Sequence, residues 1–392
     1  LENFFSMHFF RSKLTSLILS SSLLVCSSAF ANDENKSLMD MSLEEIVNID
    51  IVTGDSGGFG KQLDELKIKP YFHGYSVFNF RNIEFRDKKE IPTFDMMYLN
   101  PIIGVNIQDK ITSEMMLEFE HGGSEVGIRY GILDYSPFDF MTIRLGKFLV
   151  PIGKFNEYLY AEHINIFADR PLANSHIIPV VFADVGAQIR GNFKIIDDLG
   201  LNYAMYVSNG LQQKDDKYGA EVRSLRDNDR DQKNGNKSYG GRVGLTFAGL
   251  EGGFSLYKGA YSQDGSKNIS LYDLDLEYKK DNFEIRGEYT ASNQETDSKA
   301  IDRNGFFIET GYKFMDRYQP TLRYDYAKLD NFKTLGNELV KNPVQRVTAG
   351  FNFYPLPELN STFKFKFNYA YIIDTGVGKT ANEFVFQSAI GF

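Results

Sequence analysis

Histidine is the first residue type to test for chemistry, because histidines at helical spacing can hold a zinc ion. After residue 31 the histidines are His73, His121, His163 and His176, and none belongs to an H-x-x-x-H or H-E-x-x-H pattern. His73 lies three residues before Ser76, but this spacing in a strand puts the two side chains on opposite faces and argues against a hydrolytic pair. We therefore predict no enzyme, no catalytic residue, no metal and no cofactor.

Charged side chains are the other candidates for chemistry, because they alternate with apolar residues along many segments. If these segments are strands around a lumen, their charged face can select solutes by charge. The predicted basic residues of that face are Arg129, Arg144, Arg190, Arg242, Arg286, Lys313, Arg323, Arg346, Lys364 and Lys366. The acidic residues predicted to share it include Asp273, Asp275 and Glu284. Two interpretations stay open: walls of opposite sign that set up a field across the lumen, or ordinary ion pairs between neighbouring strands.

The first 31 residues carry the pattern of a secretory signal peptide. A short basic stretch precedes an apolar and small-residue run at 14–28, which ends in the cleavage pattern Ala29-Phe30-Ala31. We predict cleavage after Ala31, so that 1–31 is the signal peptide together with a few upstream residues. The single cysteine, Cys26, would leave with this leader, and the mature chain would then form no disulfide.

Residues 32–65 are polar and contain one helical signal. A capping box at Ser42–Glu45 precedes an apolar-rich stretch at 46–51. The run SLEEIVNIDIVTG resembles the segment ahead of the plug in energy-coupled outer-membrane receptors, which would imply contact with a periplasmic coupling protein. The alternative is a short periplasmic helix or a disordered leader, and we favour it because such a receptor needs a barrel of about 22 strands.

From residue 66 onward the hydrophobic period is two, which is the period of a β-strand with one apolar face. Residues 363–371, for example, alternate phenylalanine and tyrosine with lysine, asparagine and alanine without a break. Alternation alone fits two folds: a soluble sandwich with an aromatic core, or an outer-membrane barrel with its aromatic face in lipid.

Three features favour the barrel. The chain ends on Phe392 after Phe384, Phe386 and Ile390 on the same face, which resembles the C-terminal strand recognised for barrel insertion of outer-membrane proteins. Tight turns alternate with longer polar connections, as expected for periplasmic turns and extracellular loops. About sixteen segments have the roughly 9–11 residues that a tilted strand needs to cross a bilayer. We predict an all-β fold, a transmembrane antiparallel barrel of about 16 strands over residues 66–392, after a short N-terminal periplasmic segment.

The longer connections of this barrel are predicted at 81–94, 121–125, 149–181, 209–237, 262–268, 292–303, 329–342 and 373–382. The connection at 149–181 is the longest gap between predicted strands, and its stretch Leu159–Arg170 is expected to carry a short helix.

The run Arg144–Lys154, RLGKFLVPIGK, resembles the strand-to-loop signature of the phosphate-selective porin O/P-like family. Asp169-Arg170-Pro171 and the strand opening at Asp184-Val185-Gly186 continue the resemblance. It implies a trimeric barrel with the same number of strands, whose third loop, here 149–181, folds into the pore.

The family's anion site depends on crowded lysines and arginines, whereas this loop sets two cations against three acids. The predicted loop side of the constriction comprises Lys154, Glu157, Glu162, Asp169 and Arg170. The predicted basic wall opposite comprises Arg129, Arg144, Arg190 and Arg323. Opposed charges across a narrow aqueous gap predict weak ion selectivity instead of a tight phosphate site.

These features predict an outer-membrane porin, a water-filled channel for passive diffusion of small hydrophilic or ionic solutes. The alternative is a non-conducting barrel that acts as a receptor or adhesin through its long loops 149–181 and 209–237. We expect a homotrimer in the Gram-negative outer membrane. The protein would contact lipid and lipopolysaccharide, and the barrel-assembly machinery would recognise Phe392. The formal net charge of −9 argues against a basic nucleic-acid-binding surface, so no nucleic-acid partner is expected.

Overall fold

The computed structural model describes residues 67–85, 91–196, 198–213, 222–226, 235–297, 300–332, 339–359, 363–374 and 379–392. The chain divides into two units, Leu1–Glu65 and Leu66–Phe392, and every described residue belongs to the second unit. The predicted signal peptide at 1–31 and the predicted segment at 32–65 lie outside the described residues, so both stay predictions. In the described part of the chain, no helix is long and apolar enough to cross a membrane.

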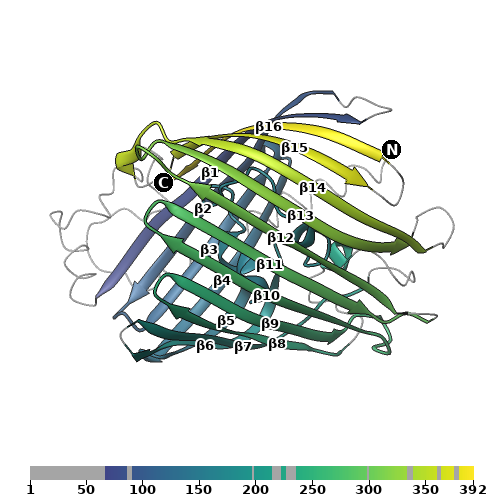
Figure 1. Cartoon of the computed structure of the whole chain (residues 1–392). Helices are drawn as coiled ribbons and strands as arrows, with labels where there is room; N and C mark the ends of the chain where they lie inside the picture. The colour runs from purple at the N-terminus through teal and green to yellow at the C-terminus, as the bar shows by residue number, and fades with distance from the viewer. Residues whose placement is uncertain are drawn as a thin grey trace, which may run out of the picture. The chain divides into compact units, whose positions relative to one another are not determined.

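Sixteen antiparallel strands form a closed barrel, in which each strand pairs with its neighbours in the sequence and β1 pairs with β16 (Figure 1). The strands are β1 (Ile68–Phe85), β2 (Thr93–Ile107), β3 (Ile111–Glu120), β4 (Glu125–Phe138), β5 (Met141–Leu149), β6 (Ala183–Ile196), β7 (Leu199–Ser208), β8 (Ser238–Phe247), β9 (Leu250–Ala260), β10 (Asn268–Lys280), β11 (Phe283–Gln294), β12 (Ile301–Tyr312), β13 (Tyr318–Phe332), β14 (Leu339–Phe353), β15 (Phe363–Asp374) and β16 (Lys379–Gly391). The predicted all-β antiparallel barrel of about 16 strands is confirmed.

The two faces of the barrel wall differ in chemistry, because successive residues of a strand point to opposite sides. On β10, Leu274 and Leu276 are 55% and 57% exposed, whereas Asp273 and Asp275 are 1% and 5% exposed. Apolar side chains therefore cover the outside, where lipid would meet them, and carboxylates point into the lumen.

The two ends of the chain close the barrel. β1 and β16 pair from Tyr75↔Gly391 to Phe85↔Ala381. One residue further along, Gly74 and Phe392 exchange two backbone hydrogen bonds of 2.8 and 2.9 Å. The C-terminal carboxyl end is thus built into the seam, which leaves no unpaired sheet edge there.

Tight turns join the strands at one end of the barrel. Ala248 and Gly249 between β8 and β9 both have positive φ, 47° and 86°. Gln108 and Asp109 between β2 and β3 do the same, at 54° and 55°. Two consecutive residues with positive φ make a turn whose twist matches that of the flanking strands, which explains why so few residues suffice.

At the opposite end several strands run further than the sequence predicted. β1 continues to Phe85 and so takes up the first part of the predicted loop 81–94. β15 continues to Asp374 and β16 begins at Lys379, both within the predicted loop 373–382. These boundaries were wrong because backbone pairing continues past the apolar band. On β1, Asn82 and Glu84 follow Phe78 and Phe80 on the outer face.

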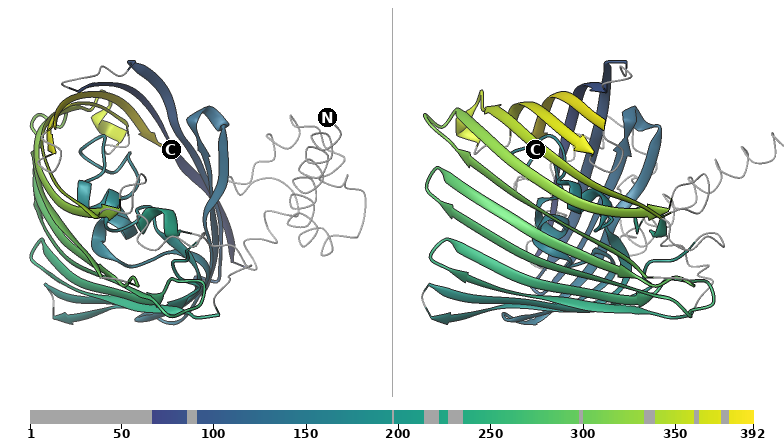
Figure 2. Two further views of the ribbon diagram at one scale, coloured as in Figure 1. Left: turned by 90° about the vertical axis from the view of Figure 1, so that its right-hand side faces the viewer. Right: turned by 45° about the vertical axis from the view of Figure 1, so that its right-hand side comes forward.

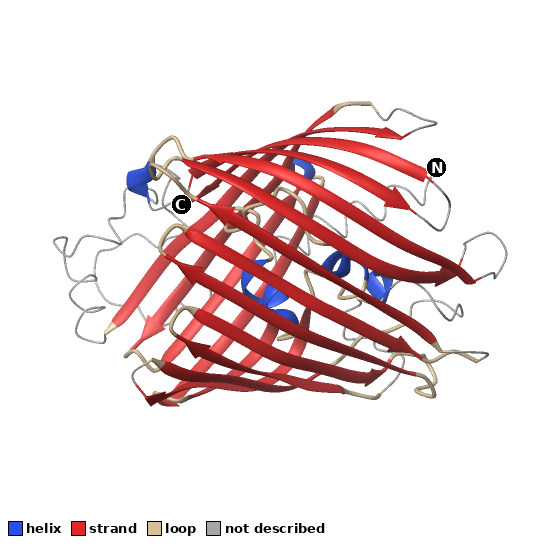
Figure 3. Ribbon diagram, viewed as in Figure 1, coloured by secondary structure: helices blue, strands red, loops and turns tan. Residues whose placement is uncertain are grey.

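The chain between β5 and β6, residues 150–182, lies inside the barrel, and we call it the inward segment. Figure 2 shows its helical turns within the ring of strands, and Figure 3 marks them in blue. These turns are η3 (Phe155–Leu159), of π type, and α4 (Leu172–His176). The predicted helix at Leu159–Arg170 is wrong, because the backbone carbonyls of that stretch bond to side chains of the barrel wall instead of to a helix.

Three further short turns lie outside the wall's strands. They are the 3-10 turns η2 (His121–Gly123), η4 (Val222–Leu225) and η5 (Pro357–Leu359).

The outward and inward faces of β8 allow a matched test of the fold. Val243 is 53% exposed on the outer face, while Thr246 faces the lumen with Glu251 of β9 as its register partner. Val243→Arg should reduce the free energy of unfolding in lipid vesicles by about 2–4 kcal/mol, because it places a cation in hydrocarbon. Thr246→Arg adds the same side chain beside a carboxylate and should be tolerated. Equal losses in the two variants would contradict the assignment of inside and outside.

Candidate functional site

Two lysines of β15 hold the middle of the inward segment by its backbone. Lys364 Nζ donates to the carbonyl oxygens of Ile164 and Asn165, at 3.2 and 3.0 Å. Lys366 Nζ donates to the carbonyl oxygen of Phe167 at 3.1 Å. Both lysine side chains are buried. The two ammonium groups therefore donate hydrogen bonds to carbonyl groups that have no partner within a helix or sheet.

Two arginines on adjacent strands continue this arrangement. Arg323 of β13 donates to the carbonyl oxygen of Asp169 at 2.9 Å, and Arg346 of β14 donates to that of Arg170 at 2.6 Å. Asp325 accepts from the Nε atoms of both wall arginines, each at 3.0 Å. One carboxylate thus orients both arginines that bind the segment.

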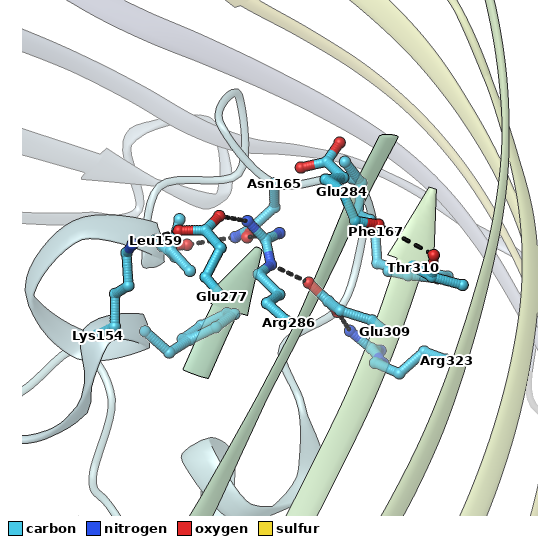
Figure 4. A network of polar contacts seen from close by, with 12 residues as sticks. Lys154, Leu159, Asn165, Phe167, Glu277, Glu284, Arg286, Glu309, Thr310 and Arg323 are labelled. Carbon is cyan, nitrogen blue, oxygen red and sulfur yellow. Dashed lines mark hydrogen bonds and ion pairs between the residues drawn. The ribbon is translucent and has the colours of Figure 1, made fainter. Parts of the chain in front are cut away.

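A chain of alternating charges runs from the segment into the wall (Figure 4). Lys154 pairs with Glu277 of β10, whose other oxygen lies 3.8 Å from Arg286 of β11. Arg286 donates to Glu309 of β12 at 2.5 Å, and Glu309 lies 3.4 Å from Arg323. Each charge in this network faces the opposite sign on the neighbouring element, so the network binds the segment through attraction between opposite charges.

The remaining predicted lumen residues also have partners on the barrel wall, on the adjacent strand or on the next one but one. Arg242 of β8 pairs with Asp275 of β10 at 2.6 Å. Asp273 accepts a hydrogen bond from Thr290 of β11 at 2.7 Å, and Glu284 accepts one from the Gln319 side chain at 2.6 Å. Within the described residues these contacts favour ion pairing between neighbours over walls of single sign.

One acid of the inward segment meets the opposite wall. Glu157 pairs with Arg190 of β6 at 2.8 Å, and the Tyr158 hydroxyl accepts a hydrogen bond from the same arginine at 3.1 Å. Arg242 and Asn202 help to line a cavity of about 10 Å³ at this contact. This contact, which we call the polar seam, brings together two residues of the predicted constriction.

The other two acids of the segment have different partners. Glu162 lies 3.1 Å from Arg170 of the same segment. Asp169 pairs with Arg81 of β1, which also pairs with Glu383 of β16. Glu162 is thus paired within the segment, whereas Asp169 links the segment to the place where β1 and β16 close the barrel.

Two arginines of the predicted basic wall do not contact acids of the segment. Arg129 pairs with Glu118 and Glu120 of β3. Arg144 makes a two-pronged contact with Asp134 of β4, both distances 2.8 Å. The structure therefore brings Arg190 and Arg323 to the segment and places Arg129 and Arg144 in pairs within the wall.

His163 shows how closely the segment packs. Its ring stacks on Tyr75 of β1 with 4.6 Å between ring centroids. Burial, together with the charges of Lys364 and Lys366, lowers the pKa of His163 to about 3. This histidine is therefore neutral over the physiological pH range and adds no charge to the segment.

Sequence reasoning missed several residues that hold the segment. Asn368 of β15 accepts a hydrogen bond from the Ala168 amide at 2.7 Å, and Asn352 of β14 donates to the Ile166 carbonyl at 2.9 Å. Alternation places both amides on the inner face, but a neutral side chain carries no signal for its partner. Arg81 was missed because the sequence assigned it to a loop.

The comparisons with known proteins agree on the fold. No family model matches the chain. An uncharacterized protein of Aquifex aeolicus is 23% identical over 322 residues, which cover 72% of each chain. Among solved structures, a loop L8 deletion mutant of OmpT, an outer membrane protein of Vibrio cholerae, matches 82% of this chain and 99% of its own, with TM-score 0.56 and 14% identity.

Two further solved structures are similar. An anion-selective porin from Comamonas acidovorans matches with TM-score 0.57 and 12% identity, over 83% of this chain and 100% of its own. The outer membrane channel DcaP of Acinetobacter baumannii matches with TM-score 0.53 and 12% identity, over 83% and 97%. The chain therefore has the barrel fold of outer-membrane porins, and membership of the phosphate-selective family stays a prediction.

The lysine anchors lead to a direct test of how the segment is held. Lys364→Met together with Lys366→Met removes the hydrogen-bond donors of several buried carbonyl groups. Each carbonyl group left without a donor should destabilise the docked segment by about 1–3 kcal/mol. We expect the segment to detach, so that trypsin cleaves it in folded, vesicle-embedded protein. Lys69→Met removes an exposed lysine that pairs with Asp109 at 3.1 Å and should change nothing. Full protease resistance of the double variant would show that these lysines do not hold the segment.

Proposed function

We propose that this protein is an outer-membrane porin through which small hydrophilic or ionic solutes diffuse passively. The proposal rests on the uneven attachment of the inward segment. Its backbone is bound by side chains of β9, β11, β13, β14 and β15, whereas at β6 it is met through the side chains of Glu157 and Tyr158. Because side chains alone hold the segment at β6, the polar seam is the contact whose side chains would move apart to let water and ions pass.

The chemistry of the polar seam supports a weakly selective channel. Glu157 and Arg190 carry opposite charges, and the other lining groups are Tyr158, Asn202 and the paired Arg242. Opposite charges across a narrow gap orient dipolar solutes and admit small ions of either sign. No feature of this seam selects phosphate.

We extend the proposal to location and assembly. The exposed apolar band and the fold favour the Gram-negative outer membrane, with export through a signal peptide cleaved after Ala31. A homotrimer is the proposed assembly, and one of the similar structures of Vibrio cholerae OmpT is described as a trimer form. Lipid and lipopolysaccharide would contact the outer face, and the barrel-assembly machinery would recognise Phe392.

The alternative is a non-conducting barrel that acts as a receptor or adhesin through its long loops. One of the two loops named for that role, 149–181, is the inward segment, and its side chains are largely buried. Of the other loop, 209–237, only residues 209–213, 222–226 and 235–237 are described. Burial of the first loop favours the channel.

Reversal potentials in planar bilayers under a salt gradient test the proposal. Arg190→Gln leaves Glu157 without its cation and should shift the reversal potential toward cations, and Glu157→Gln should shift it toward anions. The double variant should return close to the wild type, because it removes both charges. All shifts should shrink at about 1 M salt, where the screening length is about 3 Å.

Two outcomes would contradict the proposal. If the purified wild-type protein shows no ion conductance under applied voltage, the receptor or adhesin function is favoured instead. Conductance without any shift in either single variant would mean that ions bypass the polar seam.

A further inference from the structure

Two buried carboxylates of the barrel wall, Asp273 of β10 and Glu288 of β11, lie against the inward segment, and we call them the acid pair. Because Asp273 pairs in register with Thr290, two residues after Glu288, the two acids are diagonal neighbours on the inner face. A side-chain carbon at Gly153 of the segment would lie 3.0 Å from Asp273 Oδ1 and 3.0 Å from Glu288 Oε2. Both carboxylates therefore face the same point of the segment's backbone.

Glu288 binds both helical turns of the segment. Its Oε1 accepts a hydrogen bond at 2.5 Å from the backbone amide of Phe155, the first residue of η3. Its Oε2 accepts one at 2.7 Å from the side-chain amide of Asn174 in α4. Because both oxygens accept hydrogen bonds, these contacts favour the ionised form of Glu288.

Asp273 has one oxygen that lacks a partner. Its Oδ2 accepts a hydrogen bond from the Thr290 hydroxyl at 2.7 Å. Its Oδ1 is buried and has no hydrogen-bond partner among the described residues. A proton on Oδ1 would let Asp273 donate to Glu288, which two ionised carboxylates cannot do.

The surroundings of the acid pair supply no cation of its own. The charged groups nearest to it are Asp275 of β10 and Arg242 of β8, which bind each other at 2.6 Å. Its register partners on β9 and β12, Ser255 and Phe307, are uncharged. The charged side chains of the adjoining part of the segment are paired elsewhere, Lys154 with Glu277 and Glu157 with Arg190. Two buried negative charges would repel each other here, and one proton between them removes this repulsion.

We propose that Asp273 and Glu288 share one proton, and that this acid pair positions η3 at the polar seam. Phe155, which Glu288 binds, begins the turn that carries Glu157 and Tyr158 to Arg190. Loss of the shared proton adds a second negative charge to the pair, weakens its hold on η3 and widens the polar seam. The anchors on β13–β15 use other side chains and keep the rest of the segment in place. This inference rests on the proposed channel and gives it a regulation, an ion conductance that rises with pH.

Single-channel conductance in symmetrical potassium chloride tests the inference. The pH is varied from about 5 to about 10, to cover both proton-loss steps of a coupled pair. The conductance of the wild type should rise with pH. Asp273→Asn keeps an acceptor for Thr290 and donates to Glu288 at every pH, so its conductance should stay at the low-pH value of the wild type.

A second variant should have the opposite effect. Glu288→Gln turns an NH₂ group toward the amide donor of Phe155 or of Asn174, so η3 should be loosened and the conductance high over the whole pH range. A merely structural role of the two acids would not make one amide variant resemble low pH and the other high pH. The matched control is Asp109→Asn, which removes an exposed acid paired with Lys69 and should leave the pH profile unchanged.

A readout that needs no current separates this inference from the proposed channel. The predicted mature chain has no cysteine, so Tyr158→Cys accepts a single nitroxide spin label at the end of η3. In vesicle-embedded protein the mobility of this label should increase with pH. With Asp273→Asn added it should stay low at every pH. If the mobility changes in this way but no conductance is found, the proposed channel is wrong and the acid pair is confirmed.

Three results would overturn the inference. A pH dependence that persists in Asp273→Asn, which carries the test if Glu288→Gln does not fold, would place the titrating group elsewhere. A label that stays immobile over the whole pH range would show that the acid pair does not control η3. A label mobility that responds to sodium or calcium ions at constant pH, and loses this response in Asp273→Asn, would mean that a metal cation balances the pair instead of a proton.

Discussion

The carbonyl groups of the inward segment need hydrogen-bond donors inside a closed barrel. The side chains that supply these donors determine where the segment lies. The strands use their own backbone groups on each other, so the segment has no sheet edge to join. Lys364, Lys366, Arg323 and Arg346 supply the donors. Because these side chains lie on β13–β15, that side of the barrel holds the carbonyl groups of the segment, whereas the contacts of the segment at β6 are made by side chains.

The architecture was largely predictable from the sequence, and for one physical reason. A barrel wall separates an apolar outside from a polar inside. Apolar and polar residues therefore alternate along each strand, as in 363–371. Strand ends were less predictable, because this contrast disappears beyond the apolar band while backbone pairing continues, as at the end of β1. The resemblance, and not the alternation, suggested an inward third loop.

The candidate site was predictable only in part. Alternation assigned Arg323, Arg346, Lys364 and Lys366 to the lumen, but a backbone carbonyl leaves no trace in the residue type, so their partners were invisible. Glu157 and Arg190 could be placed in one constriction because the resemblance located the loop.

The central claim is that the inward segment stays docked while the protein conducts. The predicted mature chain has no cysteine, so Ala168→Cys and Asn368→Cys would place one defined pair across the contact in which the Ala168 amide lies 2.7 Å from the Asn368 side chain. The account predicts that oxidation joins the pair and leaves single-channel conductance equal to that of the reduced variant. Loss of conductance on oxidation, restored by reduction, would contradict it, because the segment would then have to leave the wall for ions to pass.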